Sequence, residues 1–169
     1  MNAPKKSTSV LIIVLAVVFG LVVIGGGTLA AVGAFGARSY VAAAKAAEAR
    51  SGVTTIAKSL AHAAGYEQPD GRPFKLTSLP PVPAVVPRGE KYMSNPAEWA
   101  AWNSINFSMS TPQRYQYEVR AAADGQSAEV IARGDLNGDG VLAIFSLKVK
   151  VSSGVVNVAS AIDETNPQE

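Results

Sequence analysis

Apolar residues dominate one uninterrupted stretch near the beginning of the chain, from Val10 to Ala37. No charged residue lies between Lys6 and Arg38. A helix needs roughly 20 apolar residues to cross a hydrocarbon core of about 30 Å. The pattern therefore predicts a transmembrane helix over residues 10–37, preceded by a basic lead over residues 1–9.

A cleaved signal peptide is the alternative interpretation of this stretch, and two features argue against it. The apolar part of a signal peptide usually spans about 7–15 residues, and this run is nearly twice as long. The end of the run, Gly33–Ala37, matches a small-residue cleavage site poorly. Lys5 and Lys6 precede the run, so the positive-inside rule predicts a single-pass protein with a cytoplasmic lead.

Residues 38–66 continue with a helical pattern that is rich in alanine, the strongest helix former. Apolar positions recur at intervals of three and four, which predicts one buried helix face. These positions are Ala46, Ala49, Val53, Ile56, Ala57 and Leu60. The predicted polar face carries Lys45, Glu48, Thr55, Ser59 and His62. We expect an amphipathic helix that prolongs the transmembrane helix, with Gly52 as a weak point and Gly65 as its end.

Prolines concentrate in the following segment, residues 67–104, which we interpret as a connector. The run Leu79–Pro87 is typical of extended, polyproline-like backbone. Such backbone is stiff, so we expect the connector to lie on the surface of the domain.

A short helix is predicted within this connector. Asn95 as a cap, Pro96 at the first position and Glu98 at the third are typical of a helix start. Such a helix would place Trp99 and Trp102 on one side. Paired tryptophans can form a binding platform, but we favour core packing in a domain with only two.

Alternating apolar and polar residues predict an antiparallel sheet over residues 105–160. The expected strands are Ile105–Met109, Tyr115–Arg120, Ala128–Arg133, Val141–Val151 and, more weakly, Val155–Val158. Asp124-Gly125 is typical of a hairpin turn. Residues 161–169 are expected to form a polar tail. The predicted fold class is α+β, a long N-terminal helix packed on a four- to five-stranded antiparallel meander.

Composition and charge exclude several classes of function. Lys5 and Lys6 account for the net charge of +2, and the rest of the chain has equal numbers of basic and acidic residues. The sequence therefore shows no basic patch of the kind that binds nucleic acid. The chain has no cysteine and one histidine, His62, which excludes disulfides, thiolate metal sites and two-histidine sites. We find no nucleophile elbow and no phosphate-binding glycine loop. We therefore expect a protein that is not an enzyme and needs no cofactor.

One motif carries candidate metal chemistry. Asp135-Leu136-Asn137-Gly138-Asp139-Gly140 matches the first half of a calcium-binding loop, in which Asp135, Asn137 and Asp139 would supply oxygen ligands. The twelfth position of such a loop is a bidentate Glu, and here it is Ser146. We favour a strand-connecting turn, because Asn, Asp and Gly tolerate the backbone conformations of turns. Weak Ca²⁺ binding stays the alternative.

The order of parts resembles that of type IV pilins and pseudopilins. Residues 38–56, with Arg38, Lys45, Glu48 and Arg50, are similar to the pilin helix just outside the membrane. Tyr115–Val119 together with Ala132–Gly140 is similar to the paired strands and Asp/Gly-rich turn of pilin-like proteins from gliding, myxobacterial-like delta-type bacteria. The chain departs from the family's leader, which ends in Gly followed by Phe and a Glu at the fifth mature position. No Glu precedes Glu48, so we expect the protein to remain in the membrane.

The resemblance implies a non-catalytic structural or assembly protein of the bacterial envelope. Its partners would be the lipid bilayer and other pilin-like or envelope subunits. Its location would be the inner membrane, with the C-terminal domain in the periplasm. The alternative is an anchored or secreted periplasmic domain that binds a ligand or calcium, with Trp99, Trp102 and the Asp135–Asp139 turn lining the site.

Overall fold

The computed structural model describes residues 40–65 and 74–169. Nearly all of these residues belong to one compact unit, Ala42–Glu169. The predicted transmembrane helix at residues 10–37 and the basic lead lie outside the described residues. Within the described part of the chain, no helix is both long enough and apolar enough to cross a membrane.

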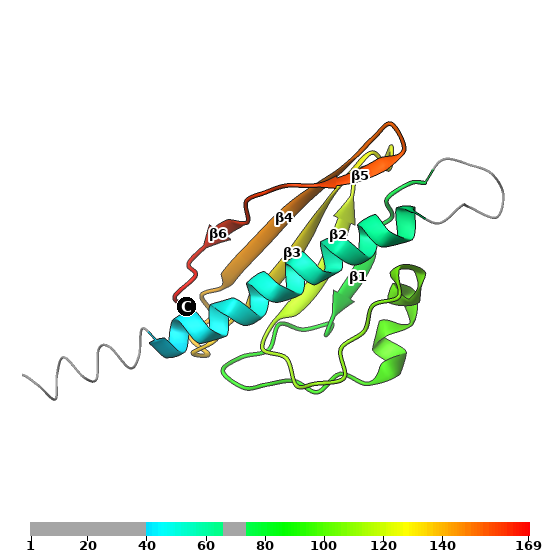
Figure 1. The fold of residues 1–169 in the computed structure, drawn as a ribbon. Helices are drawn as coiled ribbons and strands as arrows, with labels where there is room; N and C mark the ends of the chain where they lie inside the picture. Colours follow the sequence, from blue (N-terminus) through cyan, green and yellow to red (C-terminus); the bar gives the residue numbers. More distant parts are fainter. Residues whose placement is uncertain (1–39, 66–73) are drawn as a thin grey trace, which may run out of the picture. The chain divides into compact units, whose positions relative to one another are not determined.

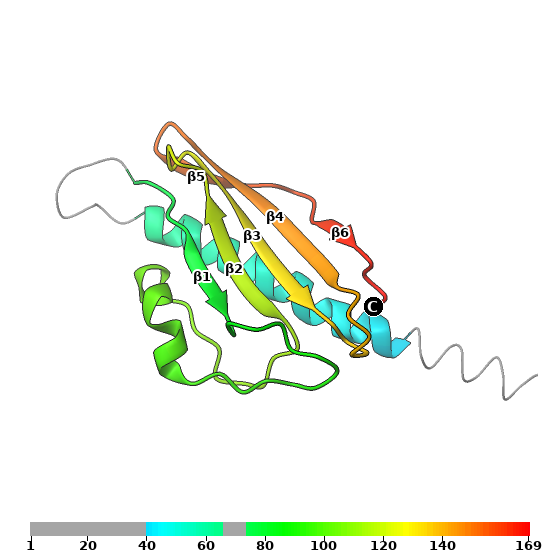
Figure 2. The same ribbon diagram turned by 180° about the vertical axis from the view of Figure 1, so that it is seen from behind.

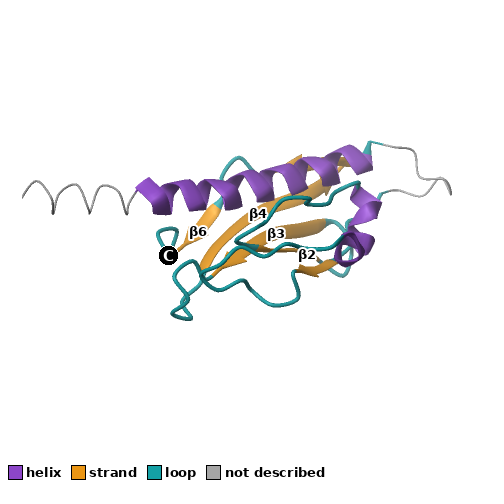
Figure 3. Ribbon diagram, turned by 90° about the horizontal axis from the view of Figure 1, so that it is seen from below, coloured by secondary structure: helices purple, strands orange, loops and turns teal. Residues whose placement is uncertain are grey.

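A long helix over residues 40–64 lies along one face of an antiparallel sheet (Figure 1). The elements that follow it are β1 (Leu79–Val82), η1 (Pro96–Ile105), β2 (Gln116–Ala121), β3 (Ser127–Gly134), β4 (Ala143–Ser152), β5 (Val155–Val158) and β6 (Asp163–Thr165). The sheet runs in the order β1-β2-β3-β4-β5, and β6 also pairs with β4. Figure 3 shows the helix and the sheet as two layers. The predicted α+β fold, a helix on an antiparallel meander, is confirmed.

The predicted apolar face of the long helix is the face that packs on the sheet. All six of its predicted apolar residues, from Ala46 to Leu60, are buried. They contact the inward-facing residues of the strands in one hydrophobic core, including Tyr117, Val130 and Phe145. Burying an aliphatic side chain contributes roughly 1.5–3 kcal/mol. The helix is therefore held mainly by this apolar face, and it ends at Gly65, as predicted.

The predicted connector contributes a strand to the sheet. Leu79–Val82 forms β1 and pairs with β2, with Leu79 opposite Val119 and Val82 opposite Tyr117. The purely polyproline-like interpretation of this run is wrong. Proline is tolerated in an edge strand, and the register is irregular between Leu79 and Val82, where the two prolines stand.

The short helix begins as predicted and extends further. The Asn95 side chain accepts hydrogen bonds from the backbone N–H groups of Ala97 and Glu98, and the Glu98 carboxylate accepts one from the Asn95 backbone N–H, which completes a capping box. The helix is of the 3₁₀ type and continues through Ile105, and Asn106 takes a left-handed conformation. The predicted strand Ile105–Met109 is wrong.

The predicted polar tail contains a strand as well. Asp163–Thr165 forms β6, which pairs with the first half of β4. All three β6 residues are exposed. Because none of them is buried, β6 shows no apolar pattern from which a strand could be predicted.

Candidate interaction surface

The outward face of the long helix carries a row of small, uncharged side chains from Ala43 to Thr55. Ala43, Ala47, Ser51 and Thr55 are exposed and follow one another at intervals of four residues. Residues four apart are neighbours on a helix surface, so they form one continuous row. Small residues let a second helix or strand approach the backbone closely.

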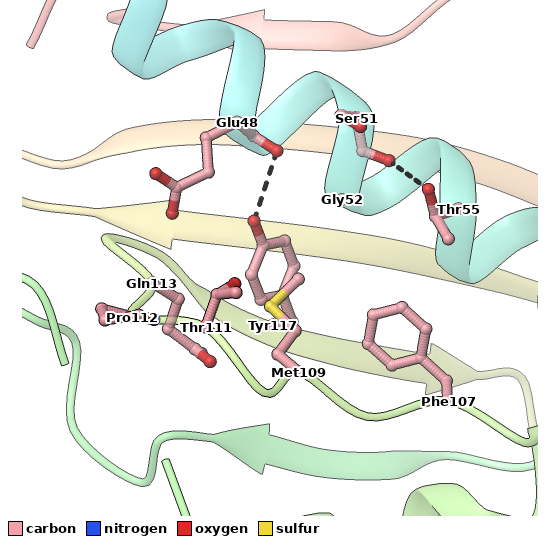
Figure 4. Close-up of a pocket in the computed structure, with 10 residues that line it drawn as sticks. All are labelled: Glu48, Ser51, Gly52, Thr55, Phe107, Met109, Thr111, Pro112, Gln113 and Tyr117. Atoms are coloured by element: carbon pink, nitrogen blue, oxygen red, sulfur yellow. Dashed lines mark hydrogen bonds between the residues drawn. The ribbon is translucent and has the colours of Figure 1, made fainter. Parts of the chain in front are cut away.

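A groove of about 300 Å³ lies beside this row, between the helix and the segment 107–113 (Figure 4). Its lining residues are Glu48, Ser51, Gly52, Thr55, Phe107, Met109, Thr111, Pro112, Gln113 and Tyr117. The groove therefore combines an apolar floor with hydroxyl groups at its rim. Sequence reasoning missed it, because its two walls lie far apart along the chain.

Gly52 allows the helix to approach the floor of this groove. A Cβ atom on Gly52 would lie 2.4 Å from Cε1 of Tyr117, far closer than packed carbon atoms come. The Tyr117 hydroxyl donates a hydrogen bond to the backbone oxygen of Glu48 (3.4 Å). The predicted weak point is therefore the place where the helix comes closest to β2. Burial, and to a lesser degree the charge of Glu48, raises the pKa of Tyr117, which stays protonated.

Charged residues at the edges of the packed helix face form hydrogen bonds to the sheet layer. The Glu48 carboxylate accepts hydrogen bonds from the backbone N–H of Arg114 (2.6 Å) and from its guanidinium (3.4 Å). Lys45 Nζ donates to the backbone oxygen of Leu136 (3.1 Å). The helical pattern predicts a polar face that includes Lys45 and Glu48, and in the structure both residues lie where that face meets the sheet.

Arg50 makes the third of these attachments. Its Nε and Nη2 donate to the two carboxylate oxygens of Glu164 on β6, at 2.7 and 2.8 Å. The guanidinium also lies 5.5 Å from the centroid of the Phe145 ring, within range of a cation–π interaction. The hydrogen bonds from Arg50 lower the pKa of the Glu164 carboxyl below its ordinary value of 4.5. The helix is thereby tied to β6 as well as to β2.

The ion pair between Arg50 and Glu164 makes the stability of the fold depend on pH. Because the pKa of Glu164 is lowered in the folded state, the pair stabilises the fold fully above the ordinary value of 4.5. That stability is lost as the pH falls through the lowered value. We expect the free energy of unfolding, measured in urea from pH 7 to 3, to fall less steeply in Glu164→Gln than in the wild type.

In Glu164→Gln the free energy of unfolding still depends on pH, and the Glu118 carboxylate accounts for part of this remaining dependence. Burial raises its pKa, but hydrogen bonds from Arg120 and Arg133 outweigh this effect and lower it. Glu90→Gln, a change at an exposed site, is the control and should keep the wild-type slope. Identical slopes in Glu164→Gln and the wild type would contradict the assignment.

The Asp/Asn/Gly motif forms the turn between β3 and β4. Asp135 is 1% exposed, and its carboxylate accepts hydrogen bonds from the N–H groups of Gly138 (2.7 Å) and Gly140 (3.1 Å). Asn137 and Asp139 accept hydrogen bonds from the N–H groups of Asp139 and Val141, respectively. The described residues contain no group of three or more acidic, histidine or cysteine side chains that could hold a metal ion. The geometry favours the turn interpretation, because the side chains of all three candidate ligands already accept hydrogen bonds from backbone N–H groups of the turn.

Asp135 is expected to stabilise this turn without any metal. Asp135→Ala should lower the free energy of unfolding by about 1–3 kcal/mol, because the turn loses two hydrogen bonds to a charged, buried carboxylate. Asp139→Ala, a change at an exposed site, should lower the free energy of unfolding by less than Asp135→Ala does. Thermal unfolding with and without millimolar Ca²⁺ checks both points. A rise in Tm with Ca²⁺ that disappears in either variant would favour the metal interpretation.

The two tryptophans belong to the core, as predicted. Trp99 and Trp102 are 1% and 0% exposed, and their rings meet edge to face at 5.2 Å. Their N–H groups donate to Ser94 Oγ (2.8 Å) and to the backbone oxygen of Pro80 (3.0 Å). Neither ring offers a face to a ligand, so the alternative site with the Asp135–Asp139 turn is not formed.

Comparison with known proteins gives no assignment. No model of a protein family matches the chain, and neither the curated proteins nor the solved structures contain a match. The arrangement of a helix on an antiparallel meander is consistent with a pilin-like fold.

Proposed function

We propose that this chain is a membrane-anchored, pilin-like structural or assembly protein of the bacterial envelope, without catalytic activity. One observation supports the proposal above the others. The long helix packs its apolar face on an antiparallel meander, and in the sequence it begins shortly after the predicted transmembrane helix ends at Ala37. This is the order of parts in type IV pilins and pseudopilins.

In this function the helix is both the anchor and a packing surface. Its inner face is held by the core, and Lys45, Glu48 and Arg50 fasten its margins. The row from Ala43 to Thr55 remains exposed. The domain would therefore present one helix face to other pilin-like or envelope subunits in the inner membrane.

Cysteine crosslinking in membranes tests the proposed packing surface. The chain has no cysteine, so a single introduced thiol reports on one position. We expect Ala47→Cys, on the exposed row, to crosslink to another copy or to a second envelope protein. Lys150→Cys is the matched control. It is exposed and alternates with the buried Val149, so it lies on the sheet face away from the helix.

Two results would contradict the proposal. One is equal crosslinking of Ala47→Cys and Lys150→Cys. The other is recovery of the full chain in the soluble fraction after cell lysis. The N-terminal mass of the purified protein tests the anchor separately, since a mature chain that begins inside residues 10–37 would indicate processing.

A further inference from the structure

β6 is bound to the sheet in a different way from the other strands. It pairs with the first half of β4, with Thr165 opposite Ile144, Glu164 opposite Phe145 and Asp163 opposite Ser146. All three β6 residues are exposed, whereas most residues of β3 and the first half of β4 are buried. The three residues of β6 are therefore held by backbone pairing and by ion pairs, and the nearest contact with the core is made by Ile162, just before the strand.

Each face of the sheet carries a cation that forms an ion pair with an acidic residue of β6. Glu164 receives the Arg50 guanidinium from the long helix. Its neighbour Asp163 receives Lys148 Nζ at 2.7 Å. Successive side chains of a strand point to opposite faces, so the two cations lie on opposite faces. We call the edge of β4 at Ile144–Ser146, together with Arg50 and Lys148, the acidic-strand slot. Its charge complements an extended Asp-Glu segment.

The connection to β6 lets this strand separate while its neighbour stays paired. β5 follows β4 through the turn Ser153-Gly154 and pairs with the second half of β4. Residues 159–162 join β5 to β6 without forming a strand. Figure 2 shows β6 at the margin of the sheet, beyond this connection. Release of β6 would therefore break its contacts to β4 and Arg50, the packing of Ile162 and the hydrogen bond from Asn166 to Leu142, and it would leave the β4–β5 pairing intact.

We propose that the acidic-strand slot exchanges its strand between copies of this chain, so that Asp163–Thr165 of one copy occupies the slot of another. A second copy carries the same segment, so it reproduces the register and both ion pairs without any new contact. Reciprocal exchange between two copies gives a closed dimer, whereas one-way exchange joins successive copies into an open linear assembly. This inference concerns the described domain and does not depend on a membrane location.

Two single-cysteine variants of the full chain, purified in mild detergent, test the exchange. One carries Ile144→Cys and the other Thr165→Cys, and these positions are partners in the register. Each variant has a different affinity tag, and the two are mixed under mild oxidation. We expect a disulfide-linked heterodimer in several-fold excess over the control mixture of Ile144→Cys with Ser108→Cys. Ser108 is exposed and lies outside the slot.

Two further variants make the result decisive. The double variant Ile144→Cys/Thr165→Cys should form an internal disulfide, which shows that the slot folds and which prevents exchange. Adding Glu164→Gln to the Thr165→Cys strand should speed the formation of the heterodimer, because the strand leaves its own slot more readily without the ion pair to Arg50. The proposal is overturned if the heterodimer does not exceed the control while the double variant closes internally. Failure of the double variant to close would also overturn it, because the register would then be wrong in solution.

Discussion

Replacing Trp102 by alanine is expected to lower the free energy of unfolding by about 3–5 kcal/mol. The side chain is fully buried, and its ring packs against Trp99 and Phe107, with centroids 5.2 and 5.7 Å away. The substitution leaves a large cavity and removes the hydrogen bond to the backbone oxygen of Pro80 in β1. Chemical denaturation followed by circular dichroism measures the loss.

Trp102→Phe is the matched control for this experiment. Phenylalanine retains most of the packing and loses the hydrogen bond, so the cost should be clearly smaller than that of alanine. A loss below about 1 kcal/mol for Trp102→Ala, well under the usual range for a buried tryptophan, would mean that η1 and β1 do not pack together as described.

Replacing Gly52 by valine is expected to cost about 3 kcal/mol or more. Adding atoms to a packed interface typically costs about 1–3 kcal/mol, and valine adds two methyl groups beyond a Cβ that already overlaps Tyr117. The helix would have to move away from β2, which would also disturb the groove and the attachment of Glu48. The free energy of unfolding in urea measures the effect.

Ser51→Val provides a control for the helix propensity of valine. Ser51 is the neighbouring residue and is exposed, so the new side chain meets solvent. Its cost should stay within a few tenths of a kcal/mol, since serine and valine have similar helix propensities. Comparable stability of Gly52→Val and Ser51→Val would contradict the close approach to Tyr117.

Much of the fold follows from local patterns that the sequence displays directly. The spacing from Ala46 to Leu60 identifies the buried helix face, and the alternation of apolar and polar residues identifies β2, β3 and β4. Asn95 and Gly65 mark helix boundaries because capping depends on a few neighbouring residues. The predicted transmembrane helix at residues 10–37 stays a prediction.

The remaining features depend on contacts between distant parts of the chain. Alternation at Ile105, Phe107 and Met109 also suits an irregular segment that packs one side on the tryptophans, and within residues 40–65 and 74–169 no strand pairs with it. β6 forms because Arg50 and Lys148, far away in sequence, meet its two acids. The role of Gly52 requires knowing that Tyr117 lies opposite. None of these pairings has a signature within a short window of sequence.

The three polar attachments of the helix also have a mechanical consequence. Lys45, Glu48 and Arg50 lie in the first half of the helix and reach three separate places: the turn after β3, the segment just before β2, and β6. A pull along the helix axis would load these bonds together in shear, whereas a pull across the axis would unzip them one after another. We expect rupture forces in optical tweezers to be higher for axial loading, and to drop most when Arg50 and Glu48 are both replaced.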